Sequence, residues 1–152
     1  MYTKHVEYDD FNGVHRSEDH MFNLTEAELT EMSLSVDGGL ESMLKRIIQA
    51  QSGPEIIKVF KDLVLKSYGV KSPDGRRFMK HDENGQPLSR AFSETEAYSI
   101  IFMELGTNDE AAIEFIKGIL PKSLNTIEME KAFNDVKAGT IPTGVSNVTP
   151  IN

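Results

Sequence analysis

The chain has 152 residues, of which 39% are hydrophobic and none is cysteine, and its formal net charge is −8 at pH 7. The length suits a single domain, and the lack of cysteine excludes disulfides and thiolate metal sites. No apolar run approaches the roughly 20 residues that span a bilayer. Because the N-terminus also lacks the apolar core of a secretory signal, we expect neither a membrane anchor nor export.

Charge is segregated along the chain. Residues 1–44 have a net charge of −8, residues 45–90 of +5, and residues 91–152 of −5. Such blocks favour either ion pairing inside one fold or association between copies of the chain, and the sequence leaves both interpretations open. For association between copies, the candidate contacts are the basic side chains Arg76, Arg77 and Lys80.

A β-hairpin is predicted for residues 1–24. Every second residue of its first strand faces one side, with the period of a half-buried strand, namely Tyr2, Lys4, Val6 and Tyr8. The pair Asn12-Gly13 is typical of a two-residue type I′ turn, in which both residues take positive φ. We therefore expect the chain to reverse at this pair and to return as a second strand.

Helices are predicted after the hairpin, and their ends are marked by capping and breaking residues. The first starts at the capping box Thr25–Glu28, in which the two residues bond reciprocally through side chain and backbone. The second covers about residues 39–51 along an apolar stripe. The third starts near Pro54 and ends at Gly69, which we expect in the left-handed conformation that terminates many helices.

The connection over residues 70–92 is basic and rich in turn residues. Turn signals occur at Ser72–Gly75 and Asn84–Pro87, so we expect either a functional loop or a short hairpin. The basic segment 66–90 could contact nucleic-acid phosphates, and a nucleic-acid-binding regulatory protein is therefore an alternative function. The acidic total charge and the lack of a known nucleic-acid-binding motif argue against it.

Two strongly apolar helices are expected next. A second capping box, Ser93–Glu96, starts a helix over about residues 94–105 that Gly106 ends. Residues 107–110 cap the following helix. Its inward stripe comprises Ala111, Ala112, Phe115, Ile116, Ile119 and Leu120. Residues 127–138 predict a further, weak helix, and the segment after it predicts a flexible tail.

Together these elements predict a mainly α fold, a small helical domain of about five helices with an N-terminal β-hairpin. The domain covers residues 1–122, and residues 123–152 form a weakly helical and then flexible C-terminal tail. No internal repeat and no second domain is evident.

Patterns that carry catalysis or bind metal ions are not found in the sequence. Glu18, Asp19 and His20 offer ligand atoms side by side, but adjacent residues of a strand point to opposite faces. No nucleophile elbow or phosphate-binding loop occurs, and Glu94 and Glu96 are explained by their place in the first turn of a helix. We therefore expect neither an enzyme nor a bound metal or cofactor.

Protein binding is the function class with positive signals. In the helix over 94–105, one face takes Tyr98, Ile101, Phe102 and Leu105, and Ile100 and Met103 lie off that face. Such a helix is either central in its own fold or carries a second apolar face that a partner covers. We take Ile100, Met103 and Ile116 as the candidate exposed apolar residues for partner binding.

A series of segments occurs in a characteristic order between residues 6 and 121. They read YDDFNG, MFNLTEAEL, GGLESMLKRII, EIIKVFKDLVLKSYGVKSPDGRRFMK, AFSETEAYSIIFMEL and AAIEFIKGILP. None is a catalytic motif, and the basic loop followed by FSETEAY is the most distinctive part. In sequence, order and spacing, these segments resemble the tail assembly chaperones of long-tailed, siphovirus-type bacteriophages.

The resemblance implies a protein that is not an enzyme and does not remain in the finished virion. It would bind the tape measure protein, keep it soluble and promote tail tube assembly in the host bacterial cytoplasm. The implied partners are the tape measure protein, the tail tube protein, a frameshifted long form of this chain and further copies of the chain in a homo-oligomer. A structural tail or connector protein stands as another alternative.

Overall fold

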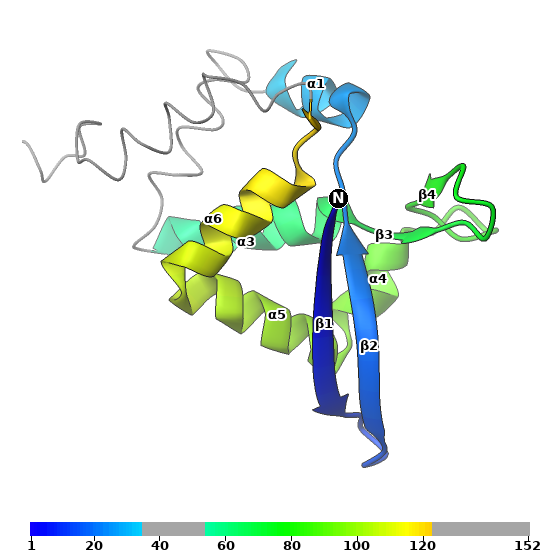
Figure 1. Cartoon of the computed structure of the whole chain (residues 1–152), viewed down its shortest axis with the longest axis vertical. Helices are drawn as coiled ribbons and strands as arrows, with labels where there is room; N and C mark the ends of the chain where they lie inside the picture. The colour runs from blue at the N-terminus through cyan, green and yellow to red at the C-terminus, as the bar shows by residue number, and fades with distance from the viewer. Residues whose placement is uncertain (35–53, 123–152) are drawn as a thin grey trace, which may run out of the picture.

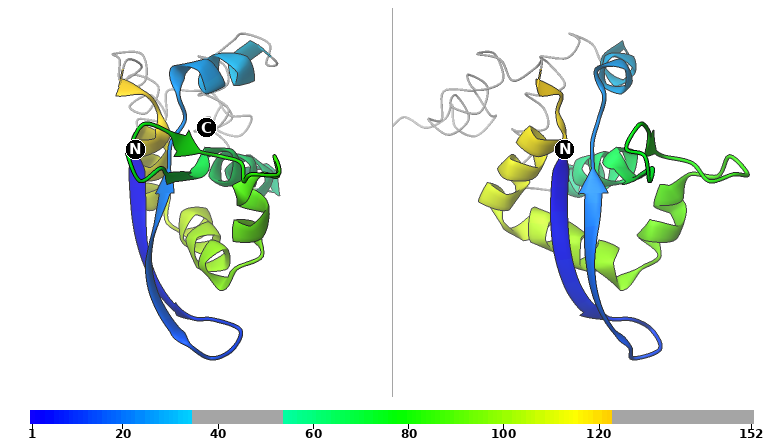
Figure 2. Two further views of the ribbon diagram at one scale, coloured as in Figure 1. Left: turned by 90° about the vertical axis from the view of Figure 1, so that its right-hand side faces the viewer. Right: turned by 45° about the vertical axis from the view of Figure 1, so that its right-hand side comes forward.

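The computed structural model describes residues 1–34 and 54–122, which combine a four-stranded antiparallel sheet with five helices (Figure 1). In sheet order, the strands are β1 (Tyr2–Asp9), β2 (His15–Phe22), β3 (Tyr68–Lys71) and β4 (Phe78–Met79). The helices are α1 (Glu26–Leu34), α3 (Pro54–Ser67), α4 (Leu88–Ser93), α5 (Glu96–Thr107) and α6 (Asp109–Ile119). The long β1–β2 hairpin has α4 and α5 on one side, and its far end reaches past them (Figure 2).

The prediction of a mainly α fold is wrong, because β3 and β4 extend the N-terminal hairpin into a four-stranded sheet. Met21 and Phe22 of β2 pair with Gly69 and Tyr68 of β3. Strands of four and two residues are too short to show an alternating pattern, so the sequence predicts only a helix end and a loop there. The N-terminal hairpin and five helices agree with the prediction.

The β1–β2 hairpin closes through Asp10 and not through a type I′ turn. The Asp10 carboxylate accepts the backbone N–H groups of Asn12 and Val14, both at 2.9 Å. Gly13 has a positive φ of 79°, whereas Asn12 does not have a positive φ. The type I′ prediction is therefore wrong, because the aspartate side chain supplies the acceptor that orders a longer loop.

The capping box predicted for the first helix is confirmed at the start of α1. The Thr25 hydroxyl accepts the Glu28 N–H at 3.2 Å, and the Glu28 carboxylate accepts the Thr25 N–H at 2.9 Å. Leu24 and Leu29, on either side of this cap, are each only 1% exposed. Local bonding and burial together fix the point at which the hairpin passes into a helix.

Gly69 does not have the helix-ending role that the sequence predicts. α3 ends at Ser67 and the chain enters β3 directly, without positive φ at Gly69. A Cβ atom at Gly69 would lie 2.5 Å from the Phe78 ring and 2.8 Å from the Met79 carbonyl oxygen. Glycine is required here because β4 approaches so closely, and the prediction of a left-handed cap is wrong.

The connection after α3 contains a short hairpin, which was one of its two interpretations. Val70 of β3 lies opposite Met79 of β4. A second reversal resembles the loop of the first hairpin: the Asp82 carboxylate accepts two backbone N–H groups, and Gly85 takes a φ of 80°. Residues 88–93 then form α4, a six-residue helix that the sequence did not predict.

α5 starts at Glu96, with Thr95 as its cap. The Thr95 hydroxyl accepts the Tyr98 N–H at 3.2 Å, whereas the Ser93 hydroxyl donates to a carbonyl of α4. The predicted capping box at Ser93–Glu96 is wrong because Ser93 belongs to the preceding helix. Gly106 lies inside α5 and does not end it.

α6 follows at once, and its predicted cap and stripe are confirmed. The Asn108 side chain accepts the Ala111 N–H at 3.1 Å. The residues that α6 and its C-terminal end bury are Ala112, Phe115, Ile116, Ile119 and Leu120. The Ile119 carbonyl also accepts the Leu24 N–H at 2.8 Å, which ties the end of α6 to the end of the hairpin.

Some predicted segments lie outside the described residues. These are the helix over 39–51, the weak helix over 127–138 and the tail after it. The division into a domain over 1–122 and a tail over 123–152 therefore stays a prediction. Within residues 1–34 and 54–122, no helix combines the length and the apolar character that crossing a membrane requires.

Replacing Gly69 by alanine should lower the free energy of unfolding by about 1–3 kcal/mol, because the added methyl group meets the Met79 backbone. Urea unfolding followed by circular dichroism measures the change. Gly106→Ala is the matched control, since a Cβ there has nothing within 4 Å and α5 gains a better helix former. Equal stability of G69A and the unsubstituted protein would show that β4 can move aside at no cost.

Candidate protein-binding surface

α5 contacts β1, α3, α4 and α6, and its outer side remains apolar. Ala97, Ile101 and Leu105 point into the core and are at most 3% exposed. Ile100 and Met103 are 37% and 56% exposed. We call these two side chains the α5 patch. Their exposure agrees with the expectation from sequence, and their role in partner binding stays a prediction.

Ile116, the third candidate, is buried and cannot form part of this surface. It is 3% exposed and belongs to the main hydrophobic core with Phe115 and Ile119. The expectation that Ile116 is exposed is wrong because its place on the inward stripe of α6 decides its position. Of the three candidate residues, Ile100 and Met103 therefore remain, and both lie on α5.

Acidic side chains flank the α5 patch. Glu96 and Glu104 stand one helical turn before and after Ile100. Glu104 pairs with Lys4 of β1, with 2.8 Å between the Lys4 Nζ and the Glu104 Oε1. Glu96 is then the flanking carboxylate that favours an amphipathic partner with a basic edge.

Lys80, one of the candidate self-association residues, is bound within its own chain. Its ammonium group donates to the carbonyls of Asn23 and Lys66, at 3.0 and 2.7 Å, and to the Glu28 carboxylate at 3.0 Å. The Lys80 side chain is 17% exposed. These bonds use its three donors, so Lys80 is not available to a second chain. Lys80 of the basic block 45–90 thus pairs with Glu28 of the acidic block 1–44 within one chain.

Arg76 and Arg77 are exposed on the loop between β3 and β4. The Arg76 N–H donates to Asp74, and the Arg77 N–H donates to the Ser72 hydroxyl, each at 3.0 Å. These backbone bonds order the loop, and within the described ranges neither guanidinium forms an ion pair. Self-association through Arg76 and Arg77 stays a prediction.

The Lys80 ammonium lies at a cleft of about 330 Å³ where α1, the end of α3 and the segment before α4 meet. Its lining residues are Glu28, Leu65, Lys66, Tyr68, Lys80, His81, Pro87 and Ser89. Burial raises the pKa of Glu28, but the bonds from Thr25 and Lys80 outweigh that effect, so that the pKa of Glu28 is lowered. Within this cleft, Glu28 and Lys80 thus bond to each other.

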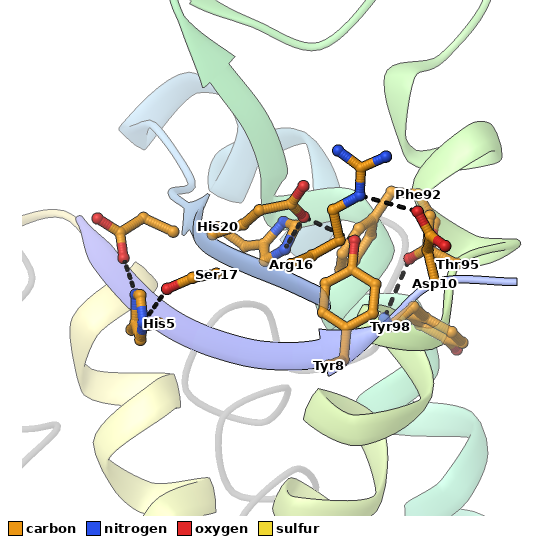
Figure 3. Close-up of polar contacts among 11 residues, drawn as sticks. His5, Tyr8, Asp10, Arg16, Ser17, His20, Phe92, Thr95 and Tyr98 are labelled. Atoms are coloured by element: carbon orange, nitrogen blue, oxygen red, sulfur yellow. Dashed lines mark hydrogen bonds and ion pairs between the residues drawn. The ribbon is translucent and has the colours of Figure 1, made fainter. Parts of the chain in front are cut away.

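His20 is a polar residue of the core that the sequence interpretation left on an exposed strand (Figure 3). Its ring centroid lies 5.3 Å from that of Phe92 and 6.3 Å from that of Tyr68, and its side chain is 11% exposed. Burial lowers the pKa of His20. Its Nε2 lies 3.5 Å from the Glu18 Oε1 and forms no hydrogen bond among the described residues. The available signal was its place two residues before Phe22, on the inward side of β2.

The outer face of the hairpin carries two further histidines among carboxylates. His5 Nδ1 lies 2.7 Å from Asp19 Oδ1, and His15 lies 3.2 Å from both Asp9 and Glu7. These bonds raise the pKa of both imidazoles, chiefly through Asp19 for His5 and through Asp9 for His15. In the part of the chain that the structure describes, no group of three His, Asp or Glu is placed to hold a metal ion.

Comparison with known proteins gives one family. Residues 1–147 match the family described as phage tail assembly chaperone, which is nearly the whole chain. No curated protein matches this sequence, and no solved structure matches this fold. The sequence match alone therefore identifies the family.

Lys80→Met should destabilise the protein at pH 7 by about 1–3 kcal/mol, because it leaves Glu28 and two carbonyl groups without their donor. The folded-state pKa of Glu28 is lowered, so its contribution is present above its unfolded pKa and is lost as the pH falls through the folded one. The difference between K80M and the unsubstituted protein should therefore shrink in urea titrations at pH 3.

Lys71→Met is the control for charge alone, since Lys71 is exposed in β3. It should change stability by less than about 0.5 kcal/mol at either pH. A loss in K71M equal to that in K80M would mean that total charge, and not the bonds of Lys80, sets the effect.

Proposed function

We infer that this chain, which belongs to the phage tail assembly chaperone family, binds the tape measure protein of its phage and keeps it soluble while the tail tube assembles. In this proposal the chain acts in the host bacterial cytoplasm and is absent from the finished virion. The tail tube protein and a frameshifted long form of the chain are its further partners.

The α5 patch is the observation that carries this proposal. A long helical tape measure protein exposes apolar stripes until the tube encloses it. Ile100 and Met103 lie three residues apart and are large, apolar and exposed. A target helix laid along α5 can place its own apolar side chains around them, as in the packing of one helix against another. Met103 adds a pliable side chain that adapts to different stripe residues.

The size of the patch suits a partner that must later be released. Full burial of a side chain such as isoleucine or methionine contributes about 1.5–3 kcal/mol, and both residues are already partly buried. Association costs offset much of that gain, so each single contact is weak. Tight coverage of a long target then requires many copies along it, each of which can be displaced as the tube advances.

The charge of the chain supports the same task. A net charge of −8 favours solubility of the chain and of its complexes. The flanking Glu96 disfavours targets whose stripes carry acidic edges. Basic, amphipathic helices are therefore the segments of a tape measure protein that we expect at α5.

Replacing Ile100 and Met103 together by glutamate should abolish co-purification with a fragment of the tape measure protein. Two carboxylates would stand where apolar contact is needed, and the exposed positions allow the chain to remain folded. Co-expression with an affinity-tagged fragment, followed by pull-down, measures binding. Circular dichroism and urea unfolding of the double variant establish that the fold is intact.

Phe11→Glu together with Val14→Glu is the matched control, because both are exposed apolar residues (79% and 50%) in the loop between β1 and β2 and do not lie on α5. This control adds the same charge and should retain binding. Ile116→Glu should unfold the protein because Ile116 is buried. Retained binding by the folded I100E/M103E variant, or equal loss in the control, would remove the α5 patch as the binding surface.

A further inference from the structure

Among the strands of the described residues, β1 pairs with β2 alone, so it is an edge strand of the sheet. The Asp10 N–H donates to the Val14 carbonyl at 2.8 Å. Bonded and non-bonded pairs alternate along an antiparallel ladder, so the even-numbered residues of β1 bond to β2. The odd-numbered residues of β1 then turn their N–H and C=O groups away from the sheet. The Asn23 N–H bond to the Ser67 carbonyl, at 2.7 Å, shows the matching alternation between β2 and β3.

The free edge of β1 consists of Thr3, His5, Glu7 and Asp9, and all four residues are exposed. Within residues 1–34 and 54–122, no backbone bond from outside the ladder reaches this edge. β1 pairs with β2 over eight residues without a bulge, and it contains no proline. Native proteins usually guard such an edge with a bulge, with proline or with charges along it, and of these β1 has the charges of Glu7 and Asp9.

An inward-pointing lysine is another common guard of an edge, and β1 has one in Lys4. Its charge is neutralised by Glu104 of α5, with 2.8 Å between the Lys4 Nζ and the Glu104 Oε1. Lys4 thus anchors β1 to the helix and does not repel an approaching strand. The edge remains open to backbone pairing.

The side chains of the edge complement a second copy of the same strand. Within one chain the exposed His5 imidazole contacts Asp19 at 2.7 Å and Ser17 at 3.0 Å. In an antiparallel pair with His5 opposite Glu7, each imidazole exchanges a contact of its own chain for the carboxylate of the other copy, and Thr3 lies opposite Asp9. The two-fold axis then passes at Val6. A shift by two residues would place His5 opposite His5, or Glu7 opposite Glu7, so one register is favoured.

We propose that β1 is a self-association surface, at which two copies of this chain join their sheets through antiparallel β1–β1 pairing with His5 opposite Glu7. The face of β1 that packs on the core needs no rearrangement for this pairing, since Val6 remains buried. The far end of the hairpin reaches beyond α4 and α5 (Figure 1). This inference does not depend on the tape measure protein as partner.

The complete lack of cysteine allows a test that also reads the register. Paired residues in this register have Cα atoms about 5.5 Å apart, which is within the range of a disulfide. His5→Cys and Glu7→Cys are purified separately in the full chain and oxidised alone and as an equimolar mixture. The mixture should give at least about ten times more disulfide-linked dimer than either variant alone, on non-reducing gels.

Ser17→Cys provides the matched control. Ser17 is exposed on the same outer face, but it lies on β2, one strand away from the edge. A mixture of H5C and S17C should give no more cross-linked dimer than H5C alone. Circular dichroism of each variant establishes that the fold is kept.

Three results would overturn the proposal. If H5C or E7C alone forms as much disulfide-linked dimer as their mixture, the register with His5 opposite Glu7 is excluded. If the mixture of H5C and S17C forms as much dimer as the mixture of H5C and E7C, the disulfides result from random collisions and not from β1–β1 pairing. If the H5C and E7C mixture gives no excess dimer and the unsubstituted chain is monomeric by light scattering at millimolar concentration, β1 does not pair with itself.

Discussion

The packing of the fold depends on Phe22, the last residue of β2. Its side chain is completely buried, and its ring centroid lies 5.6 to 6.2 Å from those of Tyr2, Tyr68, Phe92 and Phe115. These four rings come from β1, β3, α4 and α6, so one side chain connects distant parts of the sequence. A slip of β2 by one residue would turn Phe22 to solvent, and the hairpin register is therefore set by the core.

The exposed patch on α5 follows from this arrangement. With β1 and α6 packed around the aromatic cluster, α5 can turn only one stripe inward, and Ala97, Ile101 and Leu105 take it. Apolar side chains of α5 off this stripe, Ile100 and Met103, are left in solvent, because no described element covers them. One set of apolar residues on the helix thus packs in the core, and a second set forms an outer surface that suits a partner.

Two features whose causes lie within a few residues were predicted correctly from the sequence. The bonds of Thr25 with Glu28, and the cap of Asn108 on α6, involve neighbours three residues away, and both are confirmed. Gly69 was misread because its constraint comes from Phe78, which approaches it only in the folded sheet. His20 was misread for the same reason, since its aromatic neighbours lie far along the chain.

The two surfaces proposed for this chaperone are connected through one ion pair. Lys4 belongs to β1, and its partner Glu104 directly follows Met103 on α5. Pairing of two β1 edges would therefore hold two α5 patches in a fixed relation, since each helix is attached to the strand that carries the axis. A target with two apolar stripes at the matching spacing would meet the second patch at high effective concentration, so that two weak contacts become one stronger attachment. Because this gain needs the pairing and not a larger patch, each contact can remain weak enough for release.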